Sequence, residues 1–176
     1  MQQFSSAAME WEQELMKPSL YVETTVPSYY VSRDSRDVVV LAHQQITRVW
    51  RETRLADFRV YVSPVVLAEA REGDPERARR RMEILSQFEV LQASEAVERL
   101  AARYMAEFSL PGSAIRDAAH LAFACVYDMD FLVTWNCAHI ANGEVIRHLM
   151  RFNTVAGIAT PIICTPEELL GAEQET

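Results

Sequence analysis

The 176-residue sequence has no apolar run of the roughly 18 residues that a membrane-spanning helix needs. Its first residues also lack the basic patch and apolar core that make up a secretory signal. These absences argue against a membrane protein and against export. We therefore expect a cytoplasmic protein that has no membrane partner.

Cysteine is scarce and shows no pairing pattern. Cys125, Cys137 and Cys164 are an odd number and form no CxxC pair. This usage is typical of free thiols in a reducing compartment and argues against a disulfide framework. Spacings of His and Cys that would bind zinc are absent from the sequence as well.

Positive charge is also in short supply, because 17 Lys and Arg stand against 25 Asp and Glu, giving a net charge of -8. This balance argues against a protein that coats nucleic acid through bulk electrostatics. Residues 33–81 differ, since they hold eleven arginines against eight acids. The stretch is either a set of solvated helix faces with local ion pairs, or an arginine surface for phosphate or carboxylate groups.

Short apolar runs alternate with helical patterns along the chain. The runs predict strands at 20–24, 59–63, 88–91, 131–134 and 162–164, with helices between them and a last helical turn at 166–170. Strands separated by helices indicate an α/β fold, a three-layer α/β/α sandwich with a mainly parallel sheet. An α+β arrangement of the same elements is the alternative. We expect one domain at 18–171, an N-terminal extension at 1–17 and a C-terminal tail at 172–176.

A long helix is predicted at about 37–57, after a capping residue at Asp34 or Ser35. Its apolar residues recur at roughly helical spacing. We expect the face toward the core to consist of Val38, Leu41, Gln45, Val49 and Trp50, and the outward face to carry Arg48, Arg51 and Arg54.

The most informative stretch is residues 113–136, SAIRDAAHLAFACVYDMDFLVTWN, which reads as a helix leading straight into a buried strand. Asp117 lies near the start of a segment that is apolar all round. A carboxylate in such a place needs a partner cation, several hydrogen-bond donors or a metal. Asn136 follows the strand, where open α/β sheets usually form their ligand crevice.

Two further acids share this context. Glu23 ends the first predicted strand, on the same face as Tyr21, and Glu69 lies in the apolar helix PVVLAEA. If the strands are parallel, Glu23, Glu69 and Asp117 can converge at one end of the sheet. Clustered carboxylates share protons or bind a divalent cation, and oxygen-only ligands favour Mg²⁺ or Mn²⁺.

Each of these residues also has a structural explanation. Asp117 could interact with its helix dipole or with Arg116, and Glu69 could pair with Arg71. Glu23 could accept bonds from backbone amides or from a hydroxyl such as that of Thr24. Asn136 could cap the next helix.

Three neighbouring residues also have both a functional and a structural explanation. His120 is three residues after Asp117, on nearly the same helix face, and a core histidine is favoured over a general base. His139 could approach the site or organise its loop. Trp135 could stack on a base, although packing is preferred.

Four segments in this order resemble the PIN-domain family, in its VapC-like type of type II toxin–antitoxin ribonuclease. They are the first strand ending in an acid and Thr, the SPVVLAE helix, the DAAHLAFA helix and the FLVTWN strand end. The resemblance covers about residues 20–170. ETTVPSYY and TWNCAHIANGE are similar to a subgroup that has Glu in strand 1 and TWN at the end of strand 4.

The resemblance implies a divalent-metal-dependent endoribonuclease, commonly a homodimer and usually held inactive by a cognate antitoxin. Its catalytic positions map onto Glu23, Glu69, Asp117 and Asn136, and its metal ligands onto the first three. In such a site, carboxylates hold Mg²⁺ or Mn²⁺, and a water of lowered pKa attacks an RNA phosphodiester in line.

The sequence departs from the family pattern at two positions. Glu23 is one methylene longer than the usual Asp, and Asn136 is neutral where Asp is usual. Three anions instead of four predict weaker Mg²⁺ binding. Asp130 is not a replacement for the fourth acid, because six extended residues, roughly 20 Å of chain, separate it from Asn136.

Three hypotheses follow. The leading one is a Mg²⁺- or Mn²⁺-dependent ribonuclease. The second is a catalytically weak or inactive PIN-like module that binds RNA or a protein through residues 33–81. The third is a structural homodimer, in which arginines lie within hydrogen-bonding distance of Glu23, Glu69 and Asp117.

Overall fold

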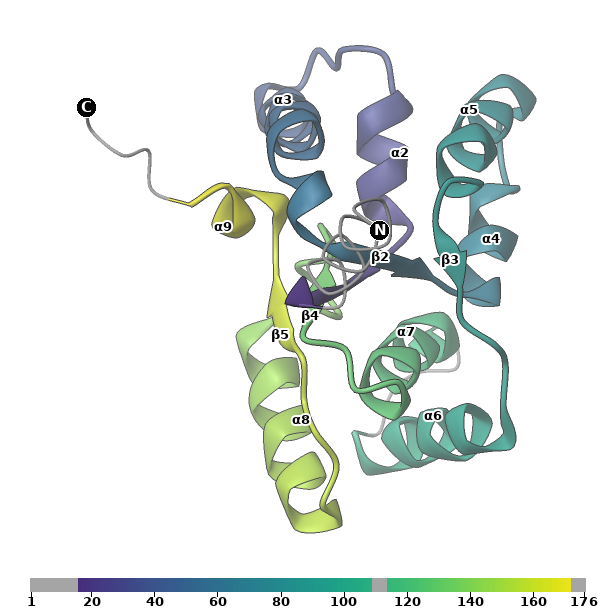
Figure 1. The fold of residues 1–176 in the computed structure, drawn as a ribbon, viewed down its shortest axis with the longest axis vertical. Helices are drawn as coiled ribbons and strands as arrows, with labels where there is room; N and C mark the ends of the chain where they lie inside the picture. The colour runs from purple at the N-terminus through teal and green to yellow at the C-terminus, as the bar shows by residue number, and fades with distance from the viewer. Residues whose placement is uncertain (1–15, 109–113, 172–176) are drawn as a thin grey trace, which may run out of the picture.

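A computed structural model describes residues 16–108 and 114–171 (Figure 1). Most of the expected N-terminal extension and the whole expected tail lie outside these residues. The strands are β1 (Ser19–Val22), β2 (Arg59–Val62), β3 (Glu89–Val90), β4 (Phe131–Val133) and β5 (Ile162–Cys164). The helices are α2 (Thr25–Val31), α3 (Val38–Thr53), α4 (Pro64–Ala70), α5 (Pro75–Leu85), α6 (Glu95–Glu107), α7 (Ile115–Val126), α8 (Gly143–Ala156) and α9 (Pro166–Leu170), with a 3-10 turn η1 (Leu55–Asp57) after α3.

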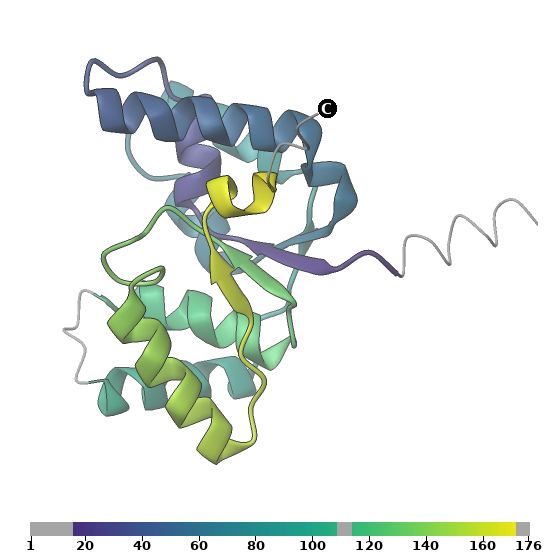
Figure 2. The same cartoon turned by 90° about the vertical axis from the view of Figure 1, so that its left-hand side faces the viewer.

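The five strands form one sheet in the order β3-β2-β1-β4-β5, and every pairing is parallel. Helices α2, α3, α5 and α9 cover one face, and α6, α7 and α8 cover the other (Figures 1 and 2). The predicted α/β sandwich is therefore confirmed, and the α+β alternative does not apply. None of the helices within residues 16–108 and 114–171 is long and apolar enough to cross a membrane.

The strand order sets where a ligand site can form. The chain moves outward from β1 through β2 to β3, then returns to place β4 on the other side of β1. The neighbours β1 and β4 are thus the point at which the winding direction reverses. Crevices of open α/β sheets lie at such a point, beyond the carboxyl ends of the strands.

The central strand is buried because helices cover both of its faces. All four residues of β1 are buried, as are Leu132 and Val133 of β4. Helix α7 packs an almost continuous buried run, residues 120–125, against the sheet. Strands covered on both sides read as unbroken apolar runs, which is why these segments could be recognised in the sequence.

Helix α4 begins as its sequence predicts. The Ser63 hydroxyl accepts a hydrogen bond from the backbone N–H of Val66, and Pro64 occupies the first helical position. Pro is favoured there because its missing N–H has no intrahelical partner to lose. This cap fixes the direction in which α4 leaves β2, and with it the position of Glu69.

The inward face predicted for α3 is correct at Trp50 but wrong at Val38, Gln45 and Val49. Val38 is 76% exposed and Val49 49% exposed, and Gln45 is exposed, whereas Gln44, Thr47 and Trp50 are buried. Gln44 bonds to the backbone of Arg33 and Ser35, and Thr47 accepts the indole N–H of Trp135. Polar side chains that find partners inside can be buried, so hydrophobicity alone assigned part of the face wrongly.

Candidate metal centre

The four predicted site residues lie near the carboxyl ends of β1 and β4. Glu23 directly follows β1, and Asn136 comes three residues after the end of β4. Glu69 lies in α4, and Asp117 lies in the first turn of α7. Burial raises the pKa of Asp117, and the negative charges of Glu23 and Glu69 raise it as well.

Glu23 is held by donors on one carboxylate oxygen only. The side chain is 4% exposed, and its Oε2 accepts from the Thr25 N–H at 3.0 Å, the Thr25 hydroxyl at 2.5 Å and the Thr134 hydroxyl at 2.8 Å. The donors are therefore Thr25 and Thr134, instead of Thr24. The second oxygen, Oε1, lies 4.0 Å from Nε2 of His120 and accepts no hydrogen bond from a described residue.

Glu69 is half-buried and also has one engaged oxygen. Its Oε2 accepts from the Thr24 hydroxyl and lies 3.1 Å from Nε2 of His120. Burial raises the pKa of Glu69, but the hydrogen bond and charge of His120, the Thr24 hydroxyl and Arg116 together outweigh it and lower the pKa. Glu69 is therefore ionised at neutral pH. The anticipated pair with Arg71 does not form, since that guanidinium donates to the Leu67 carbonyl.

Asp117 has no arginine partner among the described residues. Its Oδ1 accepts a hydrogen bond from Nδ2 of Asn136 at 2.8 Å. The neighbouring Arg116 instead makes a bidentate pair with Glu72, at 2.9 and 2.6 Å. Burial raises the pKa of Asp117, and the nearby acids raise it further against the lowering effect of His139 and His120. A cation close to this carboxylate would reverse that shift.

Asn136 combines the two roles that its position suggested. Its Oδ1 accepts the backbone N–H of His139 at 3.1 Å, so it does cap the turn that follows. Its amide nitrogen faces Asp117, and its own backbone N–H donates to the Thr134 hydroxyl. The side-chain carbonyl is thus occupied by the turn, and the amide group orients Asp117.

His120 belongs to the site, and this contact was missed from the sequence. It is 1% exposed, as expected for a core histidine. Its Nε2 contacts Glu69, while its Nδ1 lies 2.8 Å from the Tyr21 hydroxyl, which in turn lies 2.7 Å from the Ser63 hydroxyl. The available signal was the shared face of Tyr21 and Glu23 on the strand and of Asp117 and His120 on the helix.

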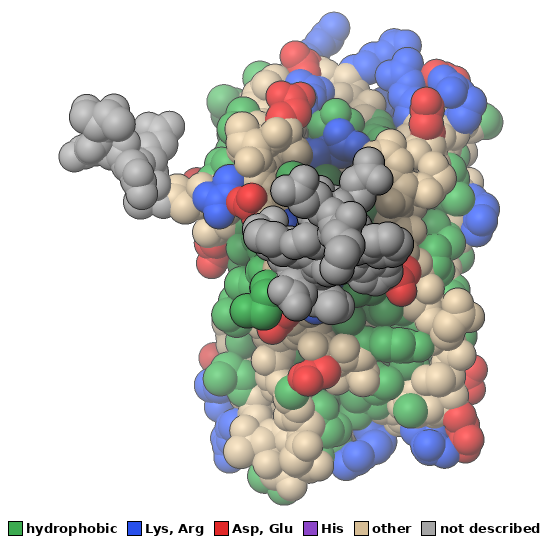
Figure 3. Space-filling model, viewed as in Figure 1, with side chains coloured by type: hydrophobic (Ala, Val, Ile, Leu, Met, Phe, Trp, Pro, Cys, Tyr) green, Lys and Arg blue, Asp and Glu red, His purple; other side chains and the backbone are tan. Residues whose placement is uncertain are grey.

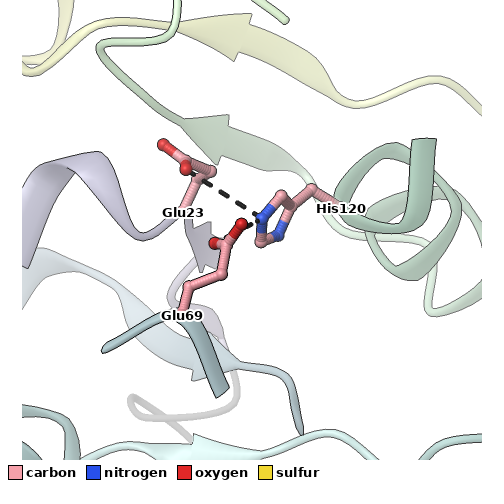
Figure 4. A group of neighbouring side chains, drawn as sticks. All are labelled: Glu23, Glu69 and His120. Carbon is pink, nitrogen blue, oxygen red and sulfur yellow. Dashed lines mark hydrogen bonds and ion pairs between the residues drawn. The ribbon is translucent and has the colours of Figure 1, made fainter. Parts of the chain in front are cut away.

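Glu23, Glu69 and His120 form a cluster in which one ligand atom from each residue lies within 4.8 Å of the others (Figure 4). This cluster could hold a metal ion. Asp117 is not a member of it, so in the described conformation the carboxylates of Glu23, Glu69 and Asp117 do not form an equally tight group.

Trp135, the aromatic residue considered for base stacking, behaves as a packing residue. Trp135 is buried, and its ring stacks on His43 with centroids 4.0 Å apart. Tyr29 meets the same Trp135 ring edge-on. A base would have to displace His43 to stack on Trp135, so the packing interpretation is favoured.

Nearby acids form ion pairs with four of the eleven arginines in residues 33–81. The ion pairs join Arg48 to Asp34, Arg54 to Asp57, Arg79 to Glu76 and Glu83, and Arg80 to Glu76. Figure 3 shows basic and acidic side chains side by side at the upper right, where Figure 1 places α5. This arrangement favours solvated helix faces with local ion pairs over a free arginine surface.

No protein-family model matches the chain, and no curated protein sequence matches it. Two solved structures are similar in fold. The first is a chain from the structure of VapBC2 of Rickettsia felis bound to a promoter DNA fragment. It has 16% sequence identity and a TM-score of 0.52, and the match covers 83% of this chain and 97% of that chain. A chain of FitAB bound to an IR36 DNA fragment has 15% identity and a TM-score of 0.55 over 89% of this chain and 99% of that one. At such low identity the likeness concerns the fold, and the chain therefore has a PIN-like α/β/α fold.

Proposed function

We propose that this protein is a divalent-metal-dependent endoribonuclease of the VapC-like type, which hydrolyses RNA phosphodiesters. The observation that carries the proposal is the chain of contacts that links the three acids beyond the carboxyl ends of β1 and β4. Thr134 bonds both Glu23 and the backbone of Asn136, and the amide of Asn136 bonds Asp117. His120 lies between Glu23 and Glu69. The similarity in fold to VapBC2 and FitAB supports it.

The donor set suits a cation. Each of the three carboxylates has one oxygen bound by donors and one that no described residue hydrogen-bonds, namely Oε1 of Glu23, Oε1 of Glu69 and Oδ2 of Asp117. Oxygen atoms left open in a partly buried acidic group are a suitable set of ligands for Mg²⁺ or Mn²⁺.

Each site residue has a part in the proposed reaction. Glu23, Glu69 and Asp117 would hold Mg²⁺ or Mn²⁺, while Thr25 and Thr134 fix Glu23 and Asn136 orients Asp117. Such a cation lowers the pKa of water and offsets negative charge on a reacting phosphate. Glu69 and Asp117 are only partly buried, so we expect RNA to approach the site at these two carboxylates, whereas Glu23 lies behind them at 4% exposure.

The first test is RNA cleavage by an Asp117→Asn variant. We expect the wild-type protein to cleave a pool of structured RNAs in Mn²⁺ and the variant to fall to background, because it lacks a site anion. Asp128→Asn makes the same change at an exposed acid just beyond α7 and should cleave like wild type. Equal background cleavage by wild type and Asp117→Asn would overturn the proposal.

A non-catalytic PIN-like module that binds RNA or a protein is the second candidate. Two observations favour it. Hydrogen bonds already reach Glu23 from Thr25 and Thr134, and Glu69 from Thr24 and His120. Asn136 is also neutral. It predicts salt-sensitive RNA binding that needs no metal. Loss of that binding in EDTA would count against it.

The structural homodimer with ion-paired acids is supported less well. Of the described arginines, only Arg116 approaches one of the three acids, and it stays 3.8 Å from Glu69 while it pairs with Glu72. The homodimer expected from the resemblance remains a prediction. We also propose an antitoxin protein as a partner, on the basis of the similarity in fold to chains of VapBC2 and FitAB.

A further inference from the structure

The tightest group of metal-binding side chains among the described residues contains an imidazole. Nε2 of His120 lies 3.1 Å from Oε2 of Glu69 and 4.0 Å from Oε1 of Glu23 (Figure 4). Atoms that each bind one cation at about 2.1 Å lie roughly 3.0 to 3.4 Å apart when they are adjacent ligands. The first separation already matches this range, and the second would have to shorten by about 0.6 to 1.0 Å.

Burial holds two of these side chains in this arrangement. His120 and Glu23 are almost completely inaccessible, and no described residue donates a hydrogen bond to Oε1 of Glu23. An ionised carboxylate oxygen is costly to bury without a donor or a cation. The dashed line in Figure 4 joins one oxygen of this carboxylate to the imidazole, and the oxygen that lacks a donor, Oε1, is the one 4.0 Å from Nε2.

The other ring nitrogen of His120 is bound as in a metal-ligating histidine. Such residues usually give their second N–H to an acceptor that fixes the tautomer and the ring orientation. The Tyr21 hydroxyl lies 2.8 Å from Nδ1 and can accept from it while donating to the Ser63 hydroxyl at 2.7 Å. Ser63 in turn is fixed as the N-cap of α4, the helix that carries Glu69.

We propose that Nε2 of His120 is a metal ligand together with Glu23 and Glu69, and that this mixed site selects first-row transition cations over Mg²⁺. The inference rests on the proposed metal site and names its cation class. Imidazole favours the later first-row dications, whereas Mg²⁺ prefers oxygen ligands and retains its waters. Affinity should therefore rise from Mg²⁺ through Mn²⁺ to Co²⁺.

Calorimetric titration of the full chain with Mg²⁺, Mn²⁺ and Co²⁺ tests the ligand set. In His120→Gln, we expect Co²⁺ affinity to fall more than about tenfold and Mg²⁺ affinity to change less, because glutamine keeps a donor for Glu69 but offers no imidazole. Tyr21→Phe removes the Nδ1 partner and should weaken Co²⁺ binding about 10- to 100-fold. His148→Gln, an exposed histidine of α8, is the matched control and should bind like wild type.

Electron spin echo spectroscopy of the Mn²⁺-loaded wild type gives a readout that does not depend on a folded variant. We expect nitrogen modulation from a coordinated imidazole, lost in His120→Gln and kept in His148→Gln. Absence of that modulation in wild type, or unchanged cation preference in a folded His120→Gln, would overturn the ligand assignment. RNA cleavage is scored separately: cleavage without nitrogen modulation leaves the nuclease proposal standing, and modulation without cleavage leaves the ligand assignment standing.

Discussion

The contact between Asn136 and Asp117 determines how many negative charges the site contains, because Asn136 is neutral. The amide nitrogen of Asn136 donates to Oδ1 of Asp117 at 2.8 Å, so a neutral donor stands where the sequence resemblance led us to expect a fourth acid. In Asn136→Asp, two carboxylates would meet at this distance. We expect the metal-free variant to lose about 1–3 kcal/mol of unfolding free energy, because a hydrogen bond becomes a repulsion.

A divalent cation should reverse this loss, since a fourth anion strengthens cation binding. Urea unfolding in EDTA and in Mn²⁺ measures both effects. Asn142→Asp is the control, because Asn142 caps α8 and aspartate is an equally good cap there. A loss of stability in EDTA that Mn²⁺ does not restore would show that Asn136 serves the fold alone.

Individual site residues could be predicted from the sequence to different degrees. Glu23, Glu69 and Asp117 stood out because a carboxylate is unusual in an apolar segment. His120 did not stand out, since a buried histidine in an apolar helix is usually a packing residue. Its contact with Glu69 depends on how α7 packs against α4, which neither helix encodes by itself.

At the scale of elements, Asp130 and Ser19 join the starts of two neighbouring strands. Oδ2 of Asp130 accepts from the Ser19 N–H at 2.7 Å and from its hydroxyl at 2.8 Å, and the Asp130 N–H donates back to that hydroxyl at 2.9 Å. This contact lies at the opposite end of β1 and β4 from the site, so Asp130 indeed cannot replace Asn136.

The same contact predicts a pH dependence of stability. The backbone N–H and then the hydroxyl of Ser19 lower the pKa of Asp130 in the folded protein. Its stabilisation is therefore complete above the unfolded-state pKa of about 3.9 and is lost as the pH falls through the lower folded-state pKa. Because Asp130 is exposed, the contribution should stay below about 1 kcal/mol.

Urea unfolding of wild type and Asp130→Asn at pH 7 and pH 2.5 measures this contribution. We expect wild type to be the more stable at pH 7 and the difference to shrink at pH 2.5, since asparagine keeps an acceptor but never ionises. Asp128→Asn, two residues earlier, should show no such change. A difference that is the same at both pH values would contradict the role of the Asp130 charge.

The elements differ in how far the sequence predicts them. All five strands are confirmed. Burial on both faces explains the clear apolar run of β1, whereas both residues of the edge strand β3 are exposed, so burial does not explain how that strand was found. The face of α3 was right only in part, because Gln44 and Thr47 are buried through bonds to Arg33 and Trp135, which lie outside the helix. A hydrophobic period cannot reveal partners of that kind.

At the scale of the whole molecule, strand order explains why residues so far apart in sequence meet. The sequence indicates parallel strands, but it does not say that β4 returns to lie beside β1. That placement brings Thr134 to Glu23 and Asn136 to the start of α7, where Asp117 lies. The site therefore depends on the strand order. The sequence alone could predict which residues belong to the site, but not how they are arranged.

The domain boundaries proposed from the sequence lead to the last prediction. The buried core runs from Leu20 to Cys164, Arg54 ties down the Leu170 carbonyl, and Met16 is 84% exposed. A chain trimmed to residues 16–171 should therefore retain the fold and the cation site. We expect its melting temperature to stay within about 4 °C of the full chain, a change of roughly 1 kcal/mol.

Thermal unfolding and Mn²⁺ titration of the trimmed and full chains test this boundary together. A second chain that begins at residue 24 is the matched control, because it lacks β1 and Glu23 and should neither fold nor bind Mn²⁺. Since β1 is the central strand, its removal separates β2 from β4 and leaves each of them as an unpaired edge strand. A large loss of stability in the 16–171 chain would place residues 1–15 or 172–176 within the folding unit, and the proposed boundaries would then be wrong.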